Sequence, residues 1–378
     1  MPDPAYPAAR HIAARTAAQF ARHQAELRET GQTELAPEPD AGAIEAIVDA
    51  AFWASLRREE GLLPKISLAF VPPNLAGQPL TFEAPLALTP SGLARLAPAV
   101  ERPGIHLGVW RIDDRLAVWG TTRSLPPVCF VLEVVASGLL VIKHRSAEFG
   151  KFVNVAVLEG DVIKFIDESR ANTPECPGLV SSLLGVPVPG IRNDPVSVVV
   201  QIAASMRAHG RGGALLLIPS TNQTWSESIV NPVLYAVHPP FAELGALVTA
   251  NARTRRSHEW QEDLRRAVDA LAGLTAVDGA TLINDRYELL AFGAKITRRR
   301  GSASVDRVVT TEPVEGSDRV TLTPYQLGGT RHFSAAQFVH DQRDATALVA
   351  SQDGRFTIFQ WSHAEEMVHA HRVEALLL

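Results

Sequence analysis

Two short stretches in the second half of this 378-residue chain combine residue types that can hold a phosphate group. The first is Asp278-Gly279-Ala280, which leads into an apolar, strand-like run ending at Ile283. A glycine lets a ligand approach the backbone closely, and a carboxylate can hold Mg²⁺ against nucleotide oxygens. Asp-Gly taken alone is also typical of a simple turn, so both interpretations stay open at this point.

The second stretch is Gly328-Gly329-Thr330-Arg331-His332, directly before the helix-like residues 333–339. Glycines at a helix N-terminus can present backbone N–H groups to an anion, while Thr330 and Arg331 add a hydroxyl and a guanidinium. The pattern therefore predicts an anion site. The alternative is an ordinary capped helix whose Arg331 is solvated.

In their order along the chain, these two stretches and the elements around them resemble the diadenylate cyclase domain. Those elements are an apolar strand at 214–219, a helix from 260 to 274, and closing strands at 346–350 and 356–359. The resemblance implies an α/β fold with a central mixed sheet flanked by helices. It also implies that Asp278 binds a metal ion, Mg²⁺ or Mn²⁺, and that Thr330, Arg331 and His332 hold ATP phosphates. The expected nucleotide-binding set is Asp278, Gly279, Ala280, Gly329, Thr330, Arg331, His332 and Ser334.

Two departures from the family pattern bear on catalysis. The second arginine of the family's Arg-His-Arg is Phe333 here, and an aromatic ring cannot neutralise a triphosphate or a leaving pyrophosphate. The family's Ser-Glu-Glu is Ser351-Gln352-Asp353, which leaves Asp353 as a weaker second metal ligand. We therefore expect a catalytically weak or inactive binding protein. The alternative is an active diadenylate cyclase that makes c-di-AMP from two ATP, with Asp278 as its catalytic metal ligand.

The connection between the two stretches is longer than in typical cyclases and carries Arg298-Arg299-Arg300. These arginines could close over phosphates as a lid, or form a solvated excursion. Together with a long N-terminal extension that includes residues 64–73 and 106–119, this feature resembles the sensor-type branch called DACNV. That resemblance implies nucleotide sensing in bacterial signalling or conflict systems. A third alternative is an interaction scaffold whose nucleotide pocket is vestigial.

The length of the chain suggests two or three units. Residues 1–40 are expected to form an amphipathic helix and a linker, because apolar residues recur at helical spacing from Ala8 to Arg28. Residues 41–190 contain short apolar runs separated by turn residues, which predict a β-rich α+β domain. The Pro- and Gly-rich segment 172–193 predicts a boundary. The diadenylate-cyclase-like domain is expected at 191–365, followed by a tail at 366–378.

A further group of potential metal ligands lies near the C-terminus, namely His363, Glu366, His369 and His371. A helix there could place some of them on one face. The usual zinc-binding helix has two histidines four residues apart, and none of these is so placed. We therefore expect a polar surface helix.

The composition limits the classes of function. With 46% hydrophobic and 20% charged residues the chain is typical of a globular protein, and its net charge of −5 argues against general nucleic-acid binding. The longest apolar runs are far shorter than the roughly 20 residues of a membrane span. The two cysteines, Cys129 and Cys176, cannot form a disulfide framework, and no secretion signal is present, so a cytoplasmic location is expected. The expected partners are an adenine nucleotide or cyclic dinucleotide, with a homo-oligomer or an effector protein beyond these.

Overall fold

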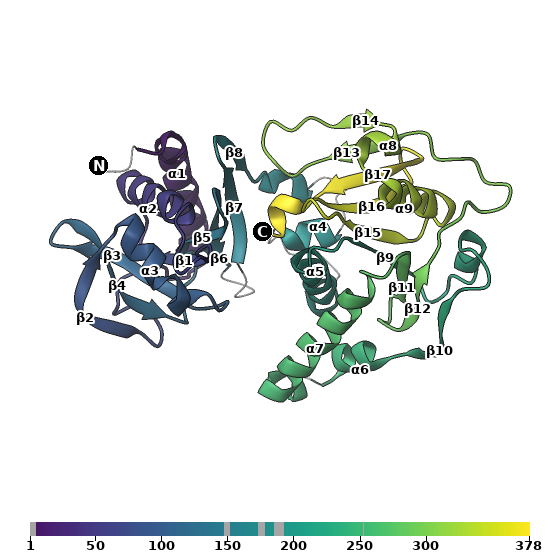
Figure 1. Ribbon diagram of the computed structural model, residues 1–378, viewed down its shortest axis with the longest axis horizontal. Coiled ribbons are helices and arrows are strands. Elements are labelled where there is room, and N and C mark those ends of the chain that lie inside the picture. The colour runs from purple at the N-terminus through teal and green to yellow at the C-terminus, as the bar shows by residue number, and fades with distance from the viewer. Residues whose placement is uncertain (1–4, 147–151, 173–177, 185–192, 252) are drawn as a thin grey trace. The chain divides into compact units, whose positions relative to one another are not determined.

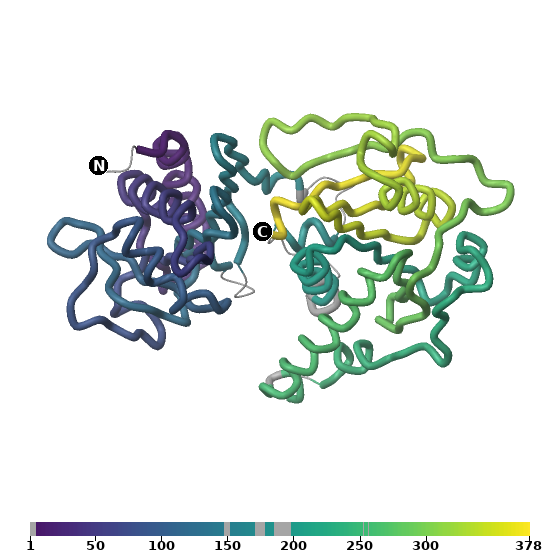
Figure 2. The backbone as a smooth tube through the Cα atoms, viewed as in Figure 1, coloured from purple at the N-terminus to yellow at the C-terminus, as the bar shows by residue number. Residues whose placement is uncertain are grey.

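The computed structural model describes residues 5–146, 152–172, 178–184, 193–251 and 253–378. The chain divides into two compact units, Met1–Ile166 with Leu378, and Asp167–Leu377 (Figures 1 and 2). Each unit has its own mixed β-sheet with helices packed against it, so the predicted mixed α/β class is confirmed. Nowhere in the described part of the chain is a helix both long and apolar enough to cross a membrane.

The first unit is built on an eight-stranded sheet with the order β2-β4-β3-β1-β5-β6-β7-β8. Neighbouring strands are antiparallel except β1 and β3, which run parallel because the connection through α3 (Pro90–Val100) crosses over. The strands are β1 (Ile66–Phe70), β2 (Leu80–Ala87), β3 (His106–Ile112), β4 (Arg115–Thr122), β5 (Phe130–Ala136), β6 (Leu139–Arg145), β7 (Phe152–Glu159) and β8 (Val162–Phe165).

Two further helices, α1 (Pro7–Glu29) and α2 (Ala41–Ser55), complete the hydrophobic core of this unit. Ile12 and Phe20 of α1 are fully buried in one cluster with Ile47 of α2 and Leu132 of β5. The N-terminal helix is thus an integral part of the first unit, whereas its amphipathic pattern alone suggested a separate segment. Burial of such side chains contributes about 1.5–3 kcal/mol each, which holds the helix in place.

The indole of Trp119 lies in a second cluster, together with Ala69, Val71 and Val131. Its Nε1 donates a hydrogen bond to the carbonyl of Val71 over 2.8 Å, so the buried polar atom is satisfied. Gly108 on the neighbouring strand leaves room for the ring, because a Cβ there would lie 2.1 Å from it. This packing requires glycine at position 108.

The second unit contains a nine-stranded sheet with the order β10-β12-β11-β9-β15-β16-β17-β13-β14. The pairs β9 with β11 and β13 with β17 are parallel, and the other neighbours are antiparallel. The strands are β9 (Gly213–Ile218), β10 (Tyr235–Phe241), β11 (Ala280–Asn284), β12 (Leu289–Ala294), β13 (Val308–Thr311), β14 (Val320–Leu322), β15 (Thr346–Ala350), β16 (Phe356–Ser362) and β17 (Met367–Arg372).

Helices pack against this sheet, and α9 is the one that matters for the site (Figure 1). Ala335 and Phe338 of α9 are fully buried against Leu216 of β9 and Phe359 of β16. Strand side chains alternate between faces, so Leu215 points to the opposite face of the sheet. The helices are α4 (Gly178–Leu183), α5 (Asn193–Ala208), α6 (Glu243–Thr249), α7 (His258–Leu274), α8 (Pro324–Leu327) and α9 (Thr330–Asp341), with 3₁₀ turns at Glu168–Asn172, Trp225–Ser228, Thr254–Arg256 and Glu374–Leu376.

The observed units differ from the expected segments at two places. The first unit ends at Ile166, so the turn at Glu168–Asn172 and α4 belong to the second unit rather than to the expected domain at 41–190. Residues expected as a tail instead form β17, which lies inside the sheet between β16 and β13. Residues 368–371 are all buried in this central strand, with apolar Val368 and Ala370 alternating with His369 and His371, and the strand replaces the polar surface helix expected there. Cys176 lies outside the described residues, and Cys129 is buried.

Candidate functional site

A cavity of about 440 Å³ in the second unit brings the two sequence motifs together. It lies where β11 begins, where β12 ends and where α9 begins. Every residue of the expected nucleotide-binding set lines it, from both the 278–280 and the 329–334 stretches. We call it the Asp278 cavity. Its volume is within the usual range for small-molecule sites, roughly 300–1,000 Å³.

Gly279 is required by the backbone of the neighbouring strand. Its φ is +122°, and a Cβ there would lie 2.5 Å from the carbonyl carbon of Gly293 in β12. Ala280 begins β11 opposite Ala294, and its side chain is buried. The glycine therefore allows close packing of β11 on β12. Gly279 also lines the cavity, and the close approach of a ligand there stays a prediction.

The Asp278 carboxylate forms an exposed ion pair at the open side of the cavity. The Nζ of Lys295, which follows β12, donates a hydrogen bond to Oδ2 of Asp278. This bond and the charge of Lys295, followed by the charge of Arg331, lower the pKa of Asp278 below its usual value. The carboxylate is therefore ionised at neutral pH.

The sequence motifs did not point to Lys295. The strand register brings it near: Ala280 pairs with Ala294, so Lys295 lies opposite Gly279, the residue next to Asp278. This cross-strand pairing is the signal that could have found it, since antiparallel partners lie about 4.5–5.5 Å apart.

The N-terminus of α9 forms another wall of the cavity. Gly329 is the N-cap, and its carbonyl accepts hydrogen bonds from the amides of His332 and Phe333 over 3.0 and 3.3 Å. The first amides of an α-helix have no intrahelical acceptor, so those of Thr330 and Arg331 are free to serve a ligand or water. The guanidinium of Arg331 passes close to Gly212, where a Cβ would lie 3.0 Å from Nη1.

His332 lines the cavity but is almost completely buried, with 2% of its surface exposed. Its Nε2 lies 3.4 Å from the hydroxyl of Thr357, and its ring meets Phe359 edge to face. Burial lowers the pKa of His332. The imidazole is therefore neutral at neutral pH and adds no positive charge for a phosphate, unlike the role that the resemblance implies.

Phe333 and Ser334 point to different surroundings. Ser334 lines the cavity, while Phe333 stacks on Tyr325 with ring centroids 4.7 Å apart and packs against the core. Phe333 is not among the residues of the cavity wall. The position where the family carries its second arginine is thus part of an aromatic pair.

The residues present do not fit the expected Mg²⁺ or Mn²⁺ site. Among the described residues that line the cavity, Asp278 carries the only carboxylate, and it is paired with Lys295. Asp353 does not line the cavity, and its carboxylate pairs with Arg355 over 3.3 Å. Mg²⁺ requires a shell of oxygen ligands in near-octahedral geometry, with which an adjacent ammonium group competes.

The arginine run lies elsewhere. Arg299 and Arg300 line a second cavity, of about 960 Å³, beside the C-terminal end of α9. The amide of Arg299 donates to Asp341 over 2.8 Å, and its side chain pairs with Glu227. One end of α9 lies roughly 16 Å from the other at 1.5 Å per residue. These contacts hold the segment that carries Arg299 and Arg300 at the C-terminal end of α9, whereas the Asp278 cavity lies at its N-terminal end. Neither arginine therefore covers the Asp278 cavity.

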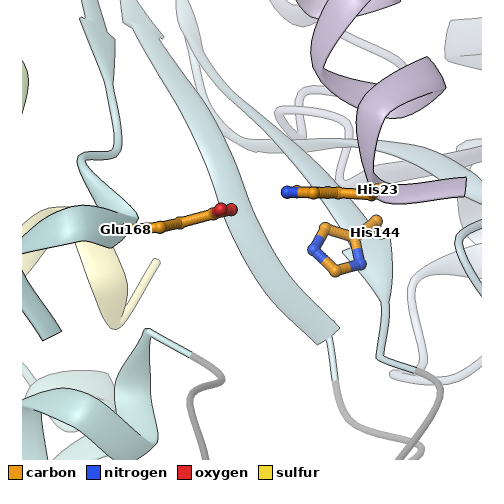
Figure 3. Close-up of side chains that lie close together, drawn as sticks. All are labelled: His23, His144 and Glu168. Carbon is orange, nitrogen blue, oxygen red and sulfur yellow. The ribbon is translucent and has the colours of Figure 1, made fainter. Parts of the chain in front are cut away.

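Four histidines outside the cavity lie in two neighbouring pairs, His369 with His371 and His23 with His144. His369 and His371 of β17 have ring centroids 5.9 Å apart, His369 Nε2 lies 3.2 Å from Glu365, and His371 Nδ1 lies 2.9 Å from the Thr311 hydroxyl. They are not part of any group of three or more potential metal ligands within the described residues. In the first unit, Figure 3 shows His23 of α1 beside His144 of β6, with ring centroids 4.9 Å apart. Glu168, also drawn there, belongs to the second unit.

Together these features define the second unit as a mixed α/β domain whose cavity, at a helix N-terminus, carries two cationic side chains. In the first unit, residues 33–123 match the family model described as Probable sensor domain DACNV. The match begins before α2 and ends just after β4, so the stretch that is similar to a probable DACNV sensor domain lies within the first unit. The matched residues do not include any that line the Asp278 cavity. No curated protein matches the chain.

Proposed function

We propose that the second unit binds the phosphate groups of an adenine nucleotide or a cyclic dinucleotide in the Asp278 cavity, and that the chain is a nucleotide sensor. The observation that carries this proposal is the convergence of two distant stretches, 278–280 and 329–334, on one cavity. The resemblance to diadenylate cyclases implies that these same stretches bind nucleotide. One ligand can contact both stretches only if they line the same cavity, as they do here.

The charges of the cavity support an anionic ligand. Lys295 and Arg331 outnumber the one carboxylate of Asp278, and the N-terminus of α9 adds backbone donors and the positive end of the helix dipole. Hydrogen bonds to charged groups contribute about 1.5–3 kcal/mol each, so Lys295 and Arg331 would supply a large part of the affinity for a phosphate.

Binding without turnover agrees best with the geometry. Phosphoryl transfer needs positive charge on the leaving pyrophosphate. The stacked ring of Phe333 supplies none, and the buried His332 is neutral. A cyclase would also need a metal at Asp278, which is engaged with Lys295.

The sensor role rests on the DACNV match in the first unit. We infer that occupancy of the Asp278 cavity is relayed to an effector protein or a second copy of the chain in a bacterial signalling or conflict system. The cytoplasmic location is part of this proposal.

The test is calorimetry and thermal shift of the full chain with AMP, ATP and c-di-AMP, with product formation followed by mass spectrometry. Arg331→Ala should weaken binding by about tenfold or more, because it removes a charge-assisted bond to phosphate. The control is Arg266→Ala on α7, whose guanidinium pairs with Asp263 away from the cavity. Wild-type affinity in Arg331→Ala, or failure of every nucleotide to bind, would contradict the proposal.

A further inference from the structure

We propose that Lys295 takes the place of a divalent metal in the Asp278 cavity, so that the nucleotide phosphate is bound directly by its ammonium group and without Mg²⁺ or Mn²⁺. This inference rests on the proposed function and deepens it. It departs from the resemblance, which implies a metal at Asp278.

The position of Lys295 is fixed by the sheet. It follows Ala294, the residue of β12 that pairs with Ala280, so its backbone lies opposite Gly279 and one residue away from Asp278. The ion pair then brings its Nζ to the carboxylate. A metal held by Asp278 would meet the same carboxylate beside a fixed positive charge, and repulsion from the ammonium group would weaken its binding.

The lysine retains capacity for a ligand. An ammonium group has three N–H donors, and Asp278 accepts from one of them. The side chain of Lys295 is 56% exposed and that of Asp278 is 87% exposed, so the pair lies at the open side of the cavity, where a phosphate can reach it. Asp278 thus serves as the residue that positions Lys295.

The net charge of the cavity indicates how much negative charge its ligand carries. Lys295, Arg331 and Asp278 together carry one net positive charge in the cavity. That charge matches a phosphate of low charge, such as a nucleoside monophosphate or one phosphodiester of a cyclic dinucleotide. A nucleoside triphosphate carries more negative charge and is usually bound with Mg²⁺ on its phosphates.

The experiment measures the Kd of AMP and of c-di-AMP for the full chain by calorimetry, in EDTA and in excess Mg²⁺. We expect the two conditions to agree within about twofold, because no metal bridges protein and phosphate. Lys295→Met keeps an aliphatic side chain of similar length. It should weaken binding about tenfold or more both in EDTA and in excess Mg²⁺, since a charge-assisted hydrogen bond to the phosphate is lost. Lys295→Arg should retain part of the affinity, and Lys65→Met, at an exposed site in the first unit, should leave it unchanged.

Asp278→Asn distinguishes a metal ligand at position 278 from a residue that only positions Lys295. If Asp278 holds a metal, this variant loses binding; if it only positions Lys295, the amide oxygen still accepts the hydrogen bond and affinity falls by no more than about threefold. Binding that requires Mg²⁺, or wild-type affinity in Lys295→Met, overturns the inference while leaving nucleotide binding intact. If no nucleotide binds under either condition, the proposed function itself fails.

Discussion

Gly328 lies directly against the imidazole of His332, so closely that a Cβ on residue 328 would be 2.4 Å from Nδ1. The next residue, Gly329, has open space where its Cβ would be. The two adjacent glycines therefore have different functions: Gly328 makes room for a buried ring, while Gly329 begins α9.

Gly328→Ala should destabilise the second unit by about 2 kcal/mol, because the added methyl group must displace a ring that is packed on Phe359. Gly329→Ala is the matched control, with an expected cost below about 1 kcal/mol for replacing an N-cap glycine. Hydrogen exchange of peptides from β16 and α9 measures both. Equal protection in the two variants would show that His332 is not held by this contact.

The wild-type chain should make little or no c-di-AMP from ATP with Mn²⁺, because Phe333 lies in an aromatic stack and brings no charge to the phosphates. Phe333→Arg should recover traces of product at most, and Phe333→Leu, which removes the ring without adding charge, should recover none. Mass spectrometry of the reaction products decides the matter. Robust synthesis by the wild type would make the chain an active cyclase.

His106 should make the first unit less stable in mild acid. The imidazole is buried, its Nδ1 lies 2.7 Å from the hydroxyl of Ser67, and Glu133 and Lys143 act on it from β5 and β6. Burial lowers the pKa of His106 from 6.5 to about 4. Between these values the unfolded chain binds the proton and the folded unit does not, so stability falls as the pH drops through this window and is unaffected above it.

The full loss is about 3.4 kcal/mol, at about 1.36 kcal/mol for each of the roughly 2.5 pH units between the two pKa values, and about 2 kcal/mol of it is reached by pH 5. Hydrogen exchange of β1 and β3 peptides at pH 7 and pH 5, corrected for intrinsic rates, measures it. His106→Asn should flatten the pH dependence, whereas His258→Asn, on the exposed face of α7, should not. A pH dependence that is the same in His106→Asn as in the wild type would contradict this assignment.

Gly108→Ala should destabilise the first unit by several kcal/mol, about 3 or more, since the methyl group would overlap the indole of Trp119 and break its hydrogen bond to Val71. The same substitution at Gly273, which lies in α7 with no atom near its Cβ position, should instead stabilise the second unit by about 0.5–1 kcal/mol. Urea denaturation with peptide-resolved hydrogen exchange compares the two. A mild effect at position 108 would mean that Trp119 can repack.

The sequence predicted part of the second unit, namely β9, β11, β15, β16, α7 and α9, because the periodicity of these elements is local. The apolar run of β9 and the helical spacing in α7 and α9 depend on neighbours along the chain, and the two motifs at their ends converged as the resemblance implies. Lys295 could not be predicted in the same way. Its importance depends on the pairing of β11 with β12, which is a relationship across strands.

Other contacts that the sequence did not show also depend on packing between elements. Gly279 suggested a ligand because its contact with Gly293 is invisible in the motif, and His332 suggested a phosphate ligand because its burial against β16 is set by tertiary packing. Asp353 was expected at the metal site, but Arg355, two residues later, engages its carboxylate. Residues 367–372 resembled a polar helix because of their histidines, but His369 and His371 are buried in β17 together with Val368 and Ala370.

The place of β17 inside the sheet has a consequence for how the chain is made. Among the described strands, the neighbours of β13 are β14 and β17, and β17 comes last along the chain. During synthesis, residues 308–322 leave the ribosome well before residues 367–372. The edge of β13 that pairs with β17 in the folded unit therefore stays unpaired until β17 has been made. The second unit therefore completes its sheet only after β17 has emerged, and a nascent chain stalled before Met367 should be recognised by chaperones while its first unit is already folded.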